Sequence, residues 1–366
     1  MHIVFISTNS IYGGSEILML RSAVEFSKQF EVSVFTRYDH YTFVNKTSLN
    51  FINYFSKNNL KSKLINKIKG KSSDLKINLI KIKPQYVIIS QGGPLSSLKE
   101  MEICINLKLP FVIINQLVCE YHWLEYKDNM FPRFKVAYSK SDLIFFVSKQ
   151  NEDLFKQFFG KEFVSKQINN PVSIESKFYL EYPDDTDVYK IAYVGRYEFY
   201  HKGLDLLLEV LKQPIWLKRN VKFNFYGKGP HQNILKDIIE RNRLSFCHVY
   251  EYTEDLLQVW SKNHISILPS RFEGKSLSIT ESMSYGRAAI ITNVGGAKEQ
   301  IDDMINGFIC ENFSYYSLNN TLEKAWNLRH EWKSMGINAR KKYLKENQVN
   351  PVFLLNNIIQ EKIQNK

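Results

Sequence analysis

Two glutamates, Glu273 and Glu281, stand eight positions apart after a short apolar run that ends at Pro269. The run at 264–268 predicts a buried strand, because proline cannot donate to a sheet ladder and so marks the strand end. Ser276 is a preferred N-cap residue, so a helix should begin there, with Glu273 in the preceding loop and Glu281 about one turn inside. Open α/β sheets bind ligands at the carboxyl ends of their strands, and the free N–H groups of a helix start suit an anion.

Two cations follow another apolar run. Residues 191–194 predict a strand that ends in Gly195 and Arg196, and Lys202 with Gly203 comes six positions later. A guanidinium can make planar bidentate contacts, whereas an ammonium is a compact point charge. Such a pair could hold a diphosphate through fixed positive charge, without a metal ion.

Loops that bear glycine follow several other predicted strands. Gly13 and Gly14 lie after the strand at 2–7, Gly227 after the strand at 221–226, and Gly296 after the strand at 288–292. Glycine is suited to places where the backbone must approach a ligand closely. The chain has no Gly-x-Gly-x-x-Gly element, which disfavours a dinucleotide site.

The order of these features resembles the retaining glycosyltransferases of family 4, which have the GT-B fold. The resemblance rests on the Glu-x7-Glu spacing, the Gly-Arg and Lys-Gly pair, the Gly-Gly-Ser-Glu element at 13–16 and the Asn-Gly turn at 306–307. It covers most of residues 188–312, and residues 1–20 and 143–172 more loosely. The alternation of strands and helices agrees with the α/β fold it implies: two doubly wound parallel-sheet (Rossmann-like) domains that face a central cleft.

The resemblance also implies roles for the charged residues. Arg196 and Lys202 would hold the pyrophosphate of a nucleotide-sugar donor, Glu281 would accept its ribose hydroxyls, and Glu273 would face the sugar. The predicted catalytic residues are Arg196, Lys202 and Glu273. The predicted donor-binding residues are Gly13, Gly14, Gly195, Gly227, Gly274, Lys275, Ser276, Leu277, Glu281 and Gly296. No metal and no cofactor other than the donor is expected.

The chain departs from the family pattern at several positions. Where many members have a histidine directly after the strand predicted at 111–115, this chain has Asn115 and Gln116, and we interpret His122 as a plain loop residue. Lys275 and Ser276 stand where Phe-Gly is common; Lys275 could add a cation at the phosphates or point to solvent. The loop at 250–253, where the nucleobase of the donor usually rests, lacks the common glycine. The identity of the donor's nucleobase is therefore not assigned.

The length of 366 residues predicts two domains. We expect an N-terminal acceptor-side domain at 1–172, a linker at 173–187 and a nucleotide-sugar-binding domain at 188–345. The acidic pair at 185 and 187 is interpreted as part of the solvated linker. The resemblance implies that the last helix, within 346–366, packs back on the first domain. Scattered cysteines and the absence of a signal-like start predict a cytoplasmic protein.

The formal charge of +12 suits an anionic partner. Residues 41–83 hold ten lysines against one acid, with apolar residues interleaved, which is typical of a segment that lies on an anionic membrane. We therefore expect hexose transfer from a UDP- or GDP-sugar to a glycan acceptor such as a polyprenyl-linked polysaccharide or lipopolysaccharide intermediate. The alternatives are a GT-B-fold sugar-nucleotide epimerase and a basic nucleic-acid-binding protein. Because no nucleic-acid recognition motif is present, nucleic acid is not an expected partner.

Overall fold

The computed structural model describes residues 1–9, 14–37, 49–54, 74–124, 130–172, 180–183 and 187–365. The chain forms two compact units. Unit 1 comprises Met1–Pro171 and Val349–Lys366, and unit 2 comprises Val172–Gln348.

Unit 1 is built on a seven-stranded parallel sheet. Its strands are β1 (His2–Ser7), β2 (Glu31–Thr36), β3 (Asn50–Asn53), β4 (Tyr86–Gln91), β5 (Phe111–Asn115), β6 (Leu143–Phe146) and β7 (Ser165–Gln167). They lie in the order β3-β2-β1-β4-β5-β6-β7, and every described pair is parallel. Because the chain leaves β1 toward β2 and later returns to its other side at β4, the sheet has a topological switch point between β1 and β4.

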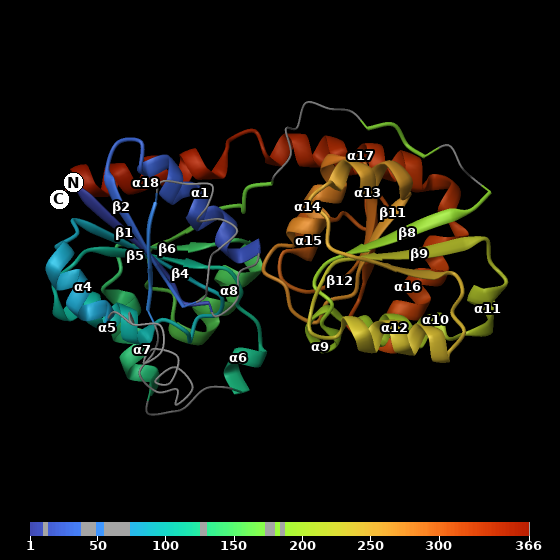
Figure 1. The fold of residues 1–366 in the computed structure, drawn as a ribbon, viewed down its shortest axis with the longest axis horizontal. Coiled ribbons are helices and arrows are strands. Elements are labelled where there is room, and N and C mark those ends of the chain that lie inside the picture. Colours follow the sequence, from blue (N-terminus) through green and yellow to red (C-terminus); the bar gives the residue numbers. More distant parts are fainter. Residues whose placement is uncertain are drawn as a thin grey trace. The chain divides into compact units, whose positions relative to one another are not determined.

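Helices cover both faces of this sheet (Figure 1). One face carries α4 (Leu75–Ile82), α5 (Leu98–Asn106), α7 (Phe131–Ser139) and α8 (Lys149–Phe159). The short α6 (Tyr121–Leu124) follows β5. The other face carries α1 (Ile17–Phe26), preceded by a 3-10 turn, η1 (Gly14–Glu16), and the C-terminal α18 (Pro351–Gln364).

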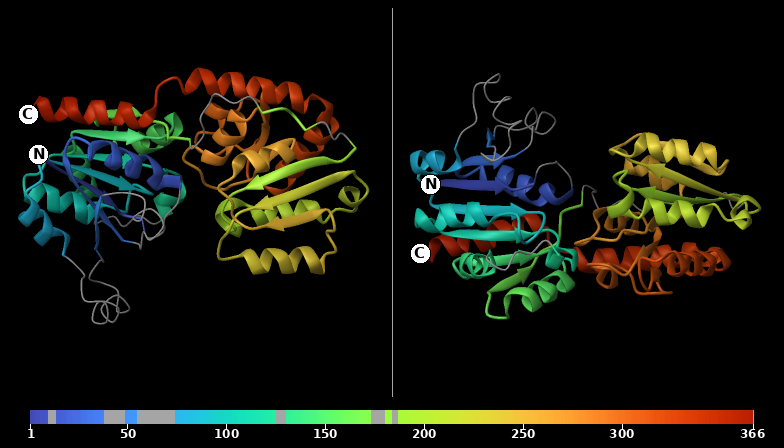
Figure 2. Two further views of the ribbon diagram at one scale, coloured as in Figure 1. Left: turned by 45° about the horizontal axis from the view of Figure 1, so that its top comes forward. Right: turned by 90° about the horizontal axis from the view of Figure 1, so that it is seen from below.

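The two ends of the chain meet in unit 1. Leu355 and Ile359 of α18 are fully buried in the same core cluster as Leu18 and Met19 of α1. Figure 2 shows this C-terminal helix, in red, on the unit that holds the blue N-terminal strand. The burial explains the apolar spacing of the last helix, because an amphipathic helix gains most of its stability from packing its apolar face.

Unit 1 contains one strand that the sequence patterns did not indicate and one feature that corrects a sequence interpretation. The sheet extends past β6, because the short β7 pairs with β6 on its outer side. We read 41–83 as one basic amphipathic segment, but residues 50–53 within it form the edge strand β3. Residues 41–48 and 55–73 of that segment lie outside the described residues.

Glu152 of α8 joins that helix to β7 and gives unit 1 a pH-dependent contact. Its side chain accepts from Lys156 and from Ser165 Oγ at 2.6 Å and is 9% exposed. Burial raises the pKa of Glu152, but the bonds from Lys156, Ser165 and Gln167 outweigh it and lower the pKa to about 2.

Glu152→Gln should therefore destabilise unit 1 by about 1–2 kcal/mol at neutral pH, a figure discounted because water reaches one side of the group. A depressed carboxyl pKa stabilises the fold above the ordinary glutamate range, so the difference from wild type should disappear between about pH 4.5 and 2. Urea unfolding at several pH values measures it. Asp153→Asn, on an exposed neighbour that pairs with Lys149, is the control and should change stability little. A pH-independent difference for Glu152→Gln would contradict the prediction.

Unit 2 has a six-stranded parallel sheet. Its strands are β8 (Tyr189–Val194), β9 (Val221–Tyr226), β10 (Cys247–Tyr250), β11 (Ile265–Leu268), β12 (Ala288–Thr292) and β13 (Gly307–Cys310). They lie in the order β10-β9-β8-β11-β12-β13. The chain therefore runs outward from β8 through β9 and β10 and returns to the other side of β8 at β11. The loops after β8, β11 and β12 become neighbours at the carboxyl edge, beside a second switch point.

The helices of unit 2 lie on both faces of its sheet (Figure 1). They are α9 (Phe199–Lys202), α10 (Leu204–Leu211), α11 (Pro214–Leu217), α12 (Gln232–Arg241), α13 (Leu256–Lys262), α14 (Leu277–Ser284), α15 (Ala297–Gln300), α16 (Tyr315–Asn327) and α17 (Trp332–Glu346), with a 3-10 turn, η3 (Arg329–Glu331), before α17. Within the described ranges, no helix is both long and apolar enough to span a bilayer.

Part of the predicted linker packs on unit 2. Arg287 is 1% exposed and donates to the carbonyl of Glu181 at 2.7 Å. The Arg287 guanidinium also lies 5.2 Å from the centre of the Tyr182 ring. Residues 173–179 and 184–186, which include the first member of the acidic pair, lie outside the described residues.

Candidate functional site

An ion pair joins two of the three predicted catalytic residues. The Lys202 ammonium, at the end of α9, lies 2.6 Å from Oε1 of Glu273, in the loop between β11 and α14. Ser270 Oγ donates to the same oxygen at 2.7 Å. The side chains of Lys202 and Glu273 are 17% and 15% exposed, so both charges are largely withdrawn from water while their outer edges remain accessible.

Close backbone packing fixes this pair. Gly203 has a φ of +65°, and a Cβ atom there would lie 1.8 Å from the carbonyl oxygen of Pro269. Gly295, with a φ of +52°, is packed as tightly against the carbonyl oxygen of Glu273. Gly296 donates its N–H to the carbonyl of Gly274 at 2.6 Å. The loop that carries Glu273 is therefore held between two glycine turns, which a side chain at either glycine would push apart.

The electrostatics keep Glu273 ionised. Burial raises the pKa of its carboxyl group, but the Lys202 ammonium and the bond from Ser270 act in the opposite direction and leave the pKa lowered. The site therefore holds a carboxylate and an ammonium side by side at neutral pH. An incoming anion would meet a cation that already has a fixed position.

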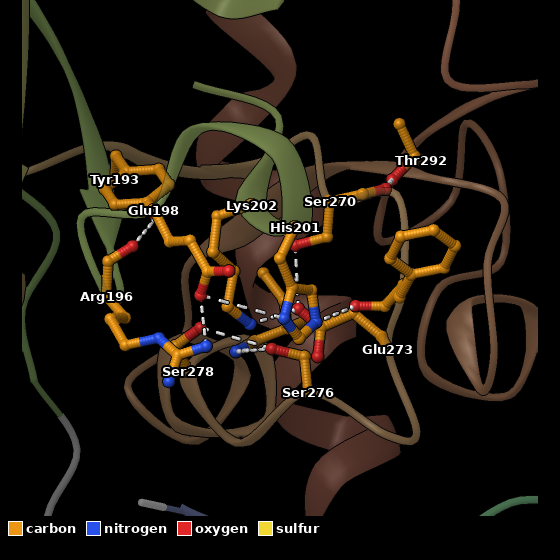
Figure 3. Close-up of polar contacts among 12 residues, drawn as sticks. Tyr193, Arg196, Glu198, His201, Lys202, Ser270, Glu273, Ser276, Ser278 and Thr292 are labelled. Atoms are coloured by element: carbon orange, nitrogen blue, oxygen red, sulfur yellow. Dashed lines mark hydrogen bonds and ion pairs between the residues drawn. The ribbon is translucent and has the colours of Figure 1, made fainter. Parts of the chain in front are cut away.

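The third predicted catalytic residue, Arg196, follows β8 directly and is ion-paired with Glu198. Arg196 is 40% exposed and Glu198 28% exposed, so water reaches both groups. Nδ1 of His201 lies 4.0 Å from the Glu198 carboxylate. Figure 3 shows Arg196, Glu198, His201, Lys202 and Glu273 gathered around the start of α14. The structure thus brings Arg196 and Lys202 into one cluster.

The start of α14 is fixed by reciprocal bonds from α15. Ser276 is the N-cap, as predicted, and its Oγ accepts from the N–H of Ile279. Gln300 accepts from the N–H of Ser276 at 3.1 Å and donates to its carbonyl at 2.8 Å. The buried amide of Gln300 thus connects the loop after β12 to the helix start after β11.

Two predicted donor-binding residues of this segment face α17. The Lys275 ammonium lies 3.9 Å from the carboxylate of Glu346, so it has an acidic neighbour inside unit 2. Glu281 lies in the second turn of α14, near enough to Tyr285 and Tyr343 for its charge to act on them. The pKa of each tyrosine is raised by burial first, and the Glu281 carboxylate adds to the effect.

The remaining predicted residues are glycines near strand or helix ends and Leu277 in α14. A Cβ atom at Gly227 would lie 1.9 Å from the carbonyl of Gly195, so the ends of β8 and β9 are in close backbone contact. Leu277 is the first residue of α14. Gly14 begins η1 in unit 1, and Gly13 lies outside the described residues. At the carboxyl ends of β9 and β10, Tyr226 and Tyr250 stack with ring centres 4.7 Å apart.

Sequence reasoning missed Ser270, Glu198 and His201, which contact the charged pair or its neighbours. Glu198 and His201 lie between Arg196 and Lys202, and their polar character was a signal that could have identified them. Nothing in the sequence around Ser270 indicates its bond to Glu273.

In unit 1, the polar residues after β5 have local partners. Asn170 donates to Gln116 Oε1 at 2.8 Å. His122 accepts the N–H of Cys119 at Nδ1, 3.2 Å away, and its Nε2 lies against Gly93. In the part of the chain that the structure describes, no group of three His, Cys, Asp or Glu residues is arranged to hold a metal ion.

The cluster of Arg196, Lys202 and Glu273 lies in a part of the chain that is similar to a known protein family. Residues 181–342 match the family model described as glycosyl transferases group 1. A glycogen synthase of Rhodopirellula baltica is 24% identical over 190 residues, which cover 48% of this chain and 37% of that protein. The chain thus spans less than half the length of the curated relatives it matches.

Solved structures align over both units. HepE of Anabaena, crystallised with UDP-glucose, has a TM-score of 0.76 at 16% identity and covers 100% of both chains. The lipopolysaccharide outer core galactosyltransferase WaaB has a TM-score of 0.70 at 18% identity and covers 99% of this chain and 100% of its own. At these identities the likeness shows the fold, and the predicted GT-B fold with two parallel-sheet α/β domains is confirmed.

Proposed function

We propose that this protein is a retaining glycosyltransferase of family 4 that moves a hexose from a UDP- or GDP-sugar to a glycan acceptor. The observation that carries the proposal is the Lys202–Glu273 pair, with Arg196 beside it, inside the region that matches glycosyl transferases group 1. HepE binds UDP and UDP-glucose in its crystals, which supports a nucleotide-sugar donor.

In this proposal, the cations stabilise the departing diphosphate. Transfer separates a sugar that develops positive charge from a diphosphate that gains negative charge. Lys202 is preorganised by Glu273 and by the Gly203 turn, so it costs little reorganisation when charge develops. Charge-assisted bonds from Arg196 and Lys202 would contribute roughly 1.5–3 kcal/mol each, and N–H groups at the start of α14 would add further donors.

The two glutamates have different tasks. Glu273 would keep Lys202 in place and present its second oxygen to the sugar, opposite the developing positive charge. Glu281 would accept the ribose hydroxyls of the donor. Because fixed side-chain cations supply the positive charge, we propose that transfer needs no metal ion. Activity that disappears in EDTA would contradict this part of the proposal.

We also propose a class of acceptor and a location in the cell for this protein. WaaB is named as a galactosyltransferase of the lipopolysaccharide outer core, which supports a lipid-linked glycan acceptor. We propose that the protein works at the cytoplasmic face of the membrane and that the lysines within residues 41–83, outside β3, contact anionic lipid. Co-sedimentation with anionic vesicles that is unchanged when Lys57, Lys61, Lys63 and Lys67 are neutralised would refute the membrane contact.

A thermal-shift screen tests the proposed donor class. UDP or GDP, at about 100 times its dissociation constant, should stabilise the protein by about 2.7 kcal/mol, which raises the melting temperature by several degrees. Glu281→Ala should remove most of this shift and sugar transfer while the protein stays folded.

A shift with single-stranded nucleic acid or heparin but with no nucleoside diphosphate would favour the nucleic-acid-binding alternative. If the protein converts a sugar nucleotide to its epimer and transfers no sugar, the epimerase alternative would be favoured. The matched relatives are named as a synthase and a transferase, which supports transfer instead.

Glu198 competes with the donor for Arg196 in this proposal. The pair is partly solvated, so it contributes only about 0–1 kcal/mol and can open. Glu198→Gln should therefore raise the affinity for UDP or GDP by about 2- to 5-fold, because one competing negative charge is removed. Titration calorimetry measures it. Glu209→Gln, which removes an exposed carboxylate paired with Lys212, should leave affinity unchanged. Weaker binding by Glu198→Gln would show that Glu198 supports the site instead.

A further inference from the structure

We propose that His201 is a positioning residue that holds the Glu273 loop in register with Lys202, and that it does so through its Nε2 atom. The proposal deepens the function proposed above and rests on it. Nε2 of His201 lies 2.7 Å from the carbonyl oxygen of Phe272. Because a carbonyl can only accept, Nε2 carries the proton and donates.

The backbone makes a second bond at the same place. The N–H of Arg271 donates to the carbonyl of His201 at 2.8 Å. Residues 271 and 272 are thus bonded to His201 through both main chain and side chain. This double contact is adjacent in sequence to Lys202 on one side and to Glu273 on the other, so its geometry sets where the ion pair forms.

The other ring nitrogen has a different environment. Nδ1 of His201 is 4.0 Å from the Glu198 carboxylate, which is too long for a hydrogen bond. Burial lowers the pKa of His201, and Lys202 lowers it further, against the opposing effects of Glu273, Glu198 and the Phe272 carbonyl. A neutral ring with its proton on Nε2 agrees with the contact to Phe272. The positioning bond is therefore made by one nitrogen of the ring.

Arg271 supports this arrangement from outside. Its guanidinium makes two bonds of 2.7 Å to the carboxylate of Asp205 in α10 and one of 2.8 Å to the carbonyl of Tyr200. These bonds tie the 271–272 segment to α9 and α10 independently of the His201 ring. Replacing the ring should therefore loosen the Glu273 loop without unfolding unit 2.

Two substitutions of His201 by an amide residue distinguish the roles of its two ring nitrogens. The amide nitrogen of glutamine reaches the position of Nε2, whereas that of asparagine reaches only the position of Nδ1. We expect His201→Gln to keep kcat within about 3-fold of wild type. His201→Asn should lower kcat by about 30- to 100-fold, because an error of about 1 Å in a catalytic group can cost 10²-fold. The KM for the donor should change by less than about 3-fold in both variants, since Arg196 and Glu281 remain.

Amide hydrogen exchange gives a readout that needs no substrate. Residues 271–276 should exchange faster in His201→Asn than in wild type and at the wild-type rate in His201→Gln. Equal kcat and equal exchange in the two variants would overturn the positioning role, including the case in which both are equally impaired. A wild-type protein that neither binds a nucleoside diphosphate nor transfers sugar would defeat the proposed function instead. The exchange difference between the variants would then still decide the role of His201.

Discussion

Lys202→Ala should reduce kcat/KM for sugar transfer by about 10²–10³-fold, the loss typical when one preorganised donor to a developing anion is removed. The variant also leaves the Glu273 carboxylate with Ser270 but without its cation. A fully buried broken pair costs about 3–5 kcal/mol, and since these side chains keep some contact with water we expect about 1–3 kcal/mol. Steady-state kinetics and urea unfolding measure the two effects.

The pH dependence separates the charge effect from a general loss of packing. The pKa of Glu273 is lowered in the fold, so its contribution to stability is present above the ordinary glutamate range and is lost as the pH falls through the depressed value. The stability difference between wild type and Lys202→Ala should therefore shrink as the pH falls through the same range.

Two further variants act as controls. Lys202→Met combined with Glu273→Gln removes both charges, so stability should recover while transfer does not. Lys212→Ala removes an exposed lysine that pairs with Glu209 and should affect neither property. Wild-type transfer by Lys202→Ala would show that another group binds the leaving phosphate.

Gly203→Ala should destabilise unit 2 by more than about 3 kcal/mol and abolish transfer. The added Cβ would stand 1.8 Å from the carbonyl oxygen of Pro269, a rigid backbone atom, in a residue already at a φ of +65°. The chain must move away from β11, and Lys202 moves with it. Left-handed strain alone costs about 1–2 kcal/mol, so most of the expected loss comes from the steric overlap.

Gly286→Ala is the matched control. Gly286 has a φ of +72°, but the nearest atom to an added Cβ is the carbonyl oxygen of Gly336 at 3.7 Å, an ordinary contact. We expect a loss of about 1–2 kcal/mol with transfer retained. Tryptophan fluorescence during urea unfolding reports on unit 2, which holds Trp216, Trp260, Trp326 and Trp332. Equal destabilisation by the two variants would mean that the close approach of Gly203 to Pro269 is not what positions Lys202.

Local features of unit 2 could be predicted from the sequence because short-range rules determine them. The apolar run at 265–268 is β11, and Ser276 caps α14. Strand formation and helix capping depend on residues within a few positions of one another. Two parallel-sheet units also followed from the sequence, since alternating strand and helix patterns in two halves favour them, and the resemblance to family 4 supplied the GT-B fold.

Sequence patterns were less informative where pairing partners were distant. The short β7 has the sequence Ser-Lys-Gln, and β3 has only Phe51 and Ile52 as apolar residues inside a lysine-rich segment, so neither shows a full apolar strand pattern. Both become strands because a neighbouring strand offers its backbone N–H and C=O groups, which local periodicity does not reveal.

The composition of the site was decided by the tertiary structure. Lys202 and Glu273 are 71 residues apart in the chain, and they meet because β11 returns to the side of β8 opposite β9. The same return brings the Phe272 carbonyl to His201, whereas the bond from Ser270 to Glu273 is made within a single loop. By itself, the sequence determined which charged residues stand after strands. Strand order and the close packing of Gly203 and Gly295 decided which of them touch, because a hydrogen bond or ion pair depends on distances of a few ångströms that residue spacing does not encode.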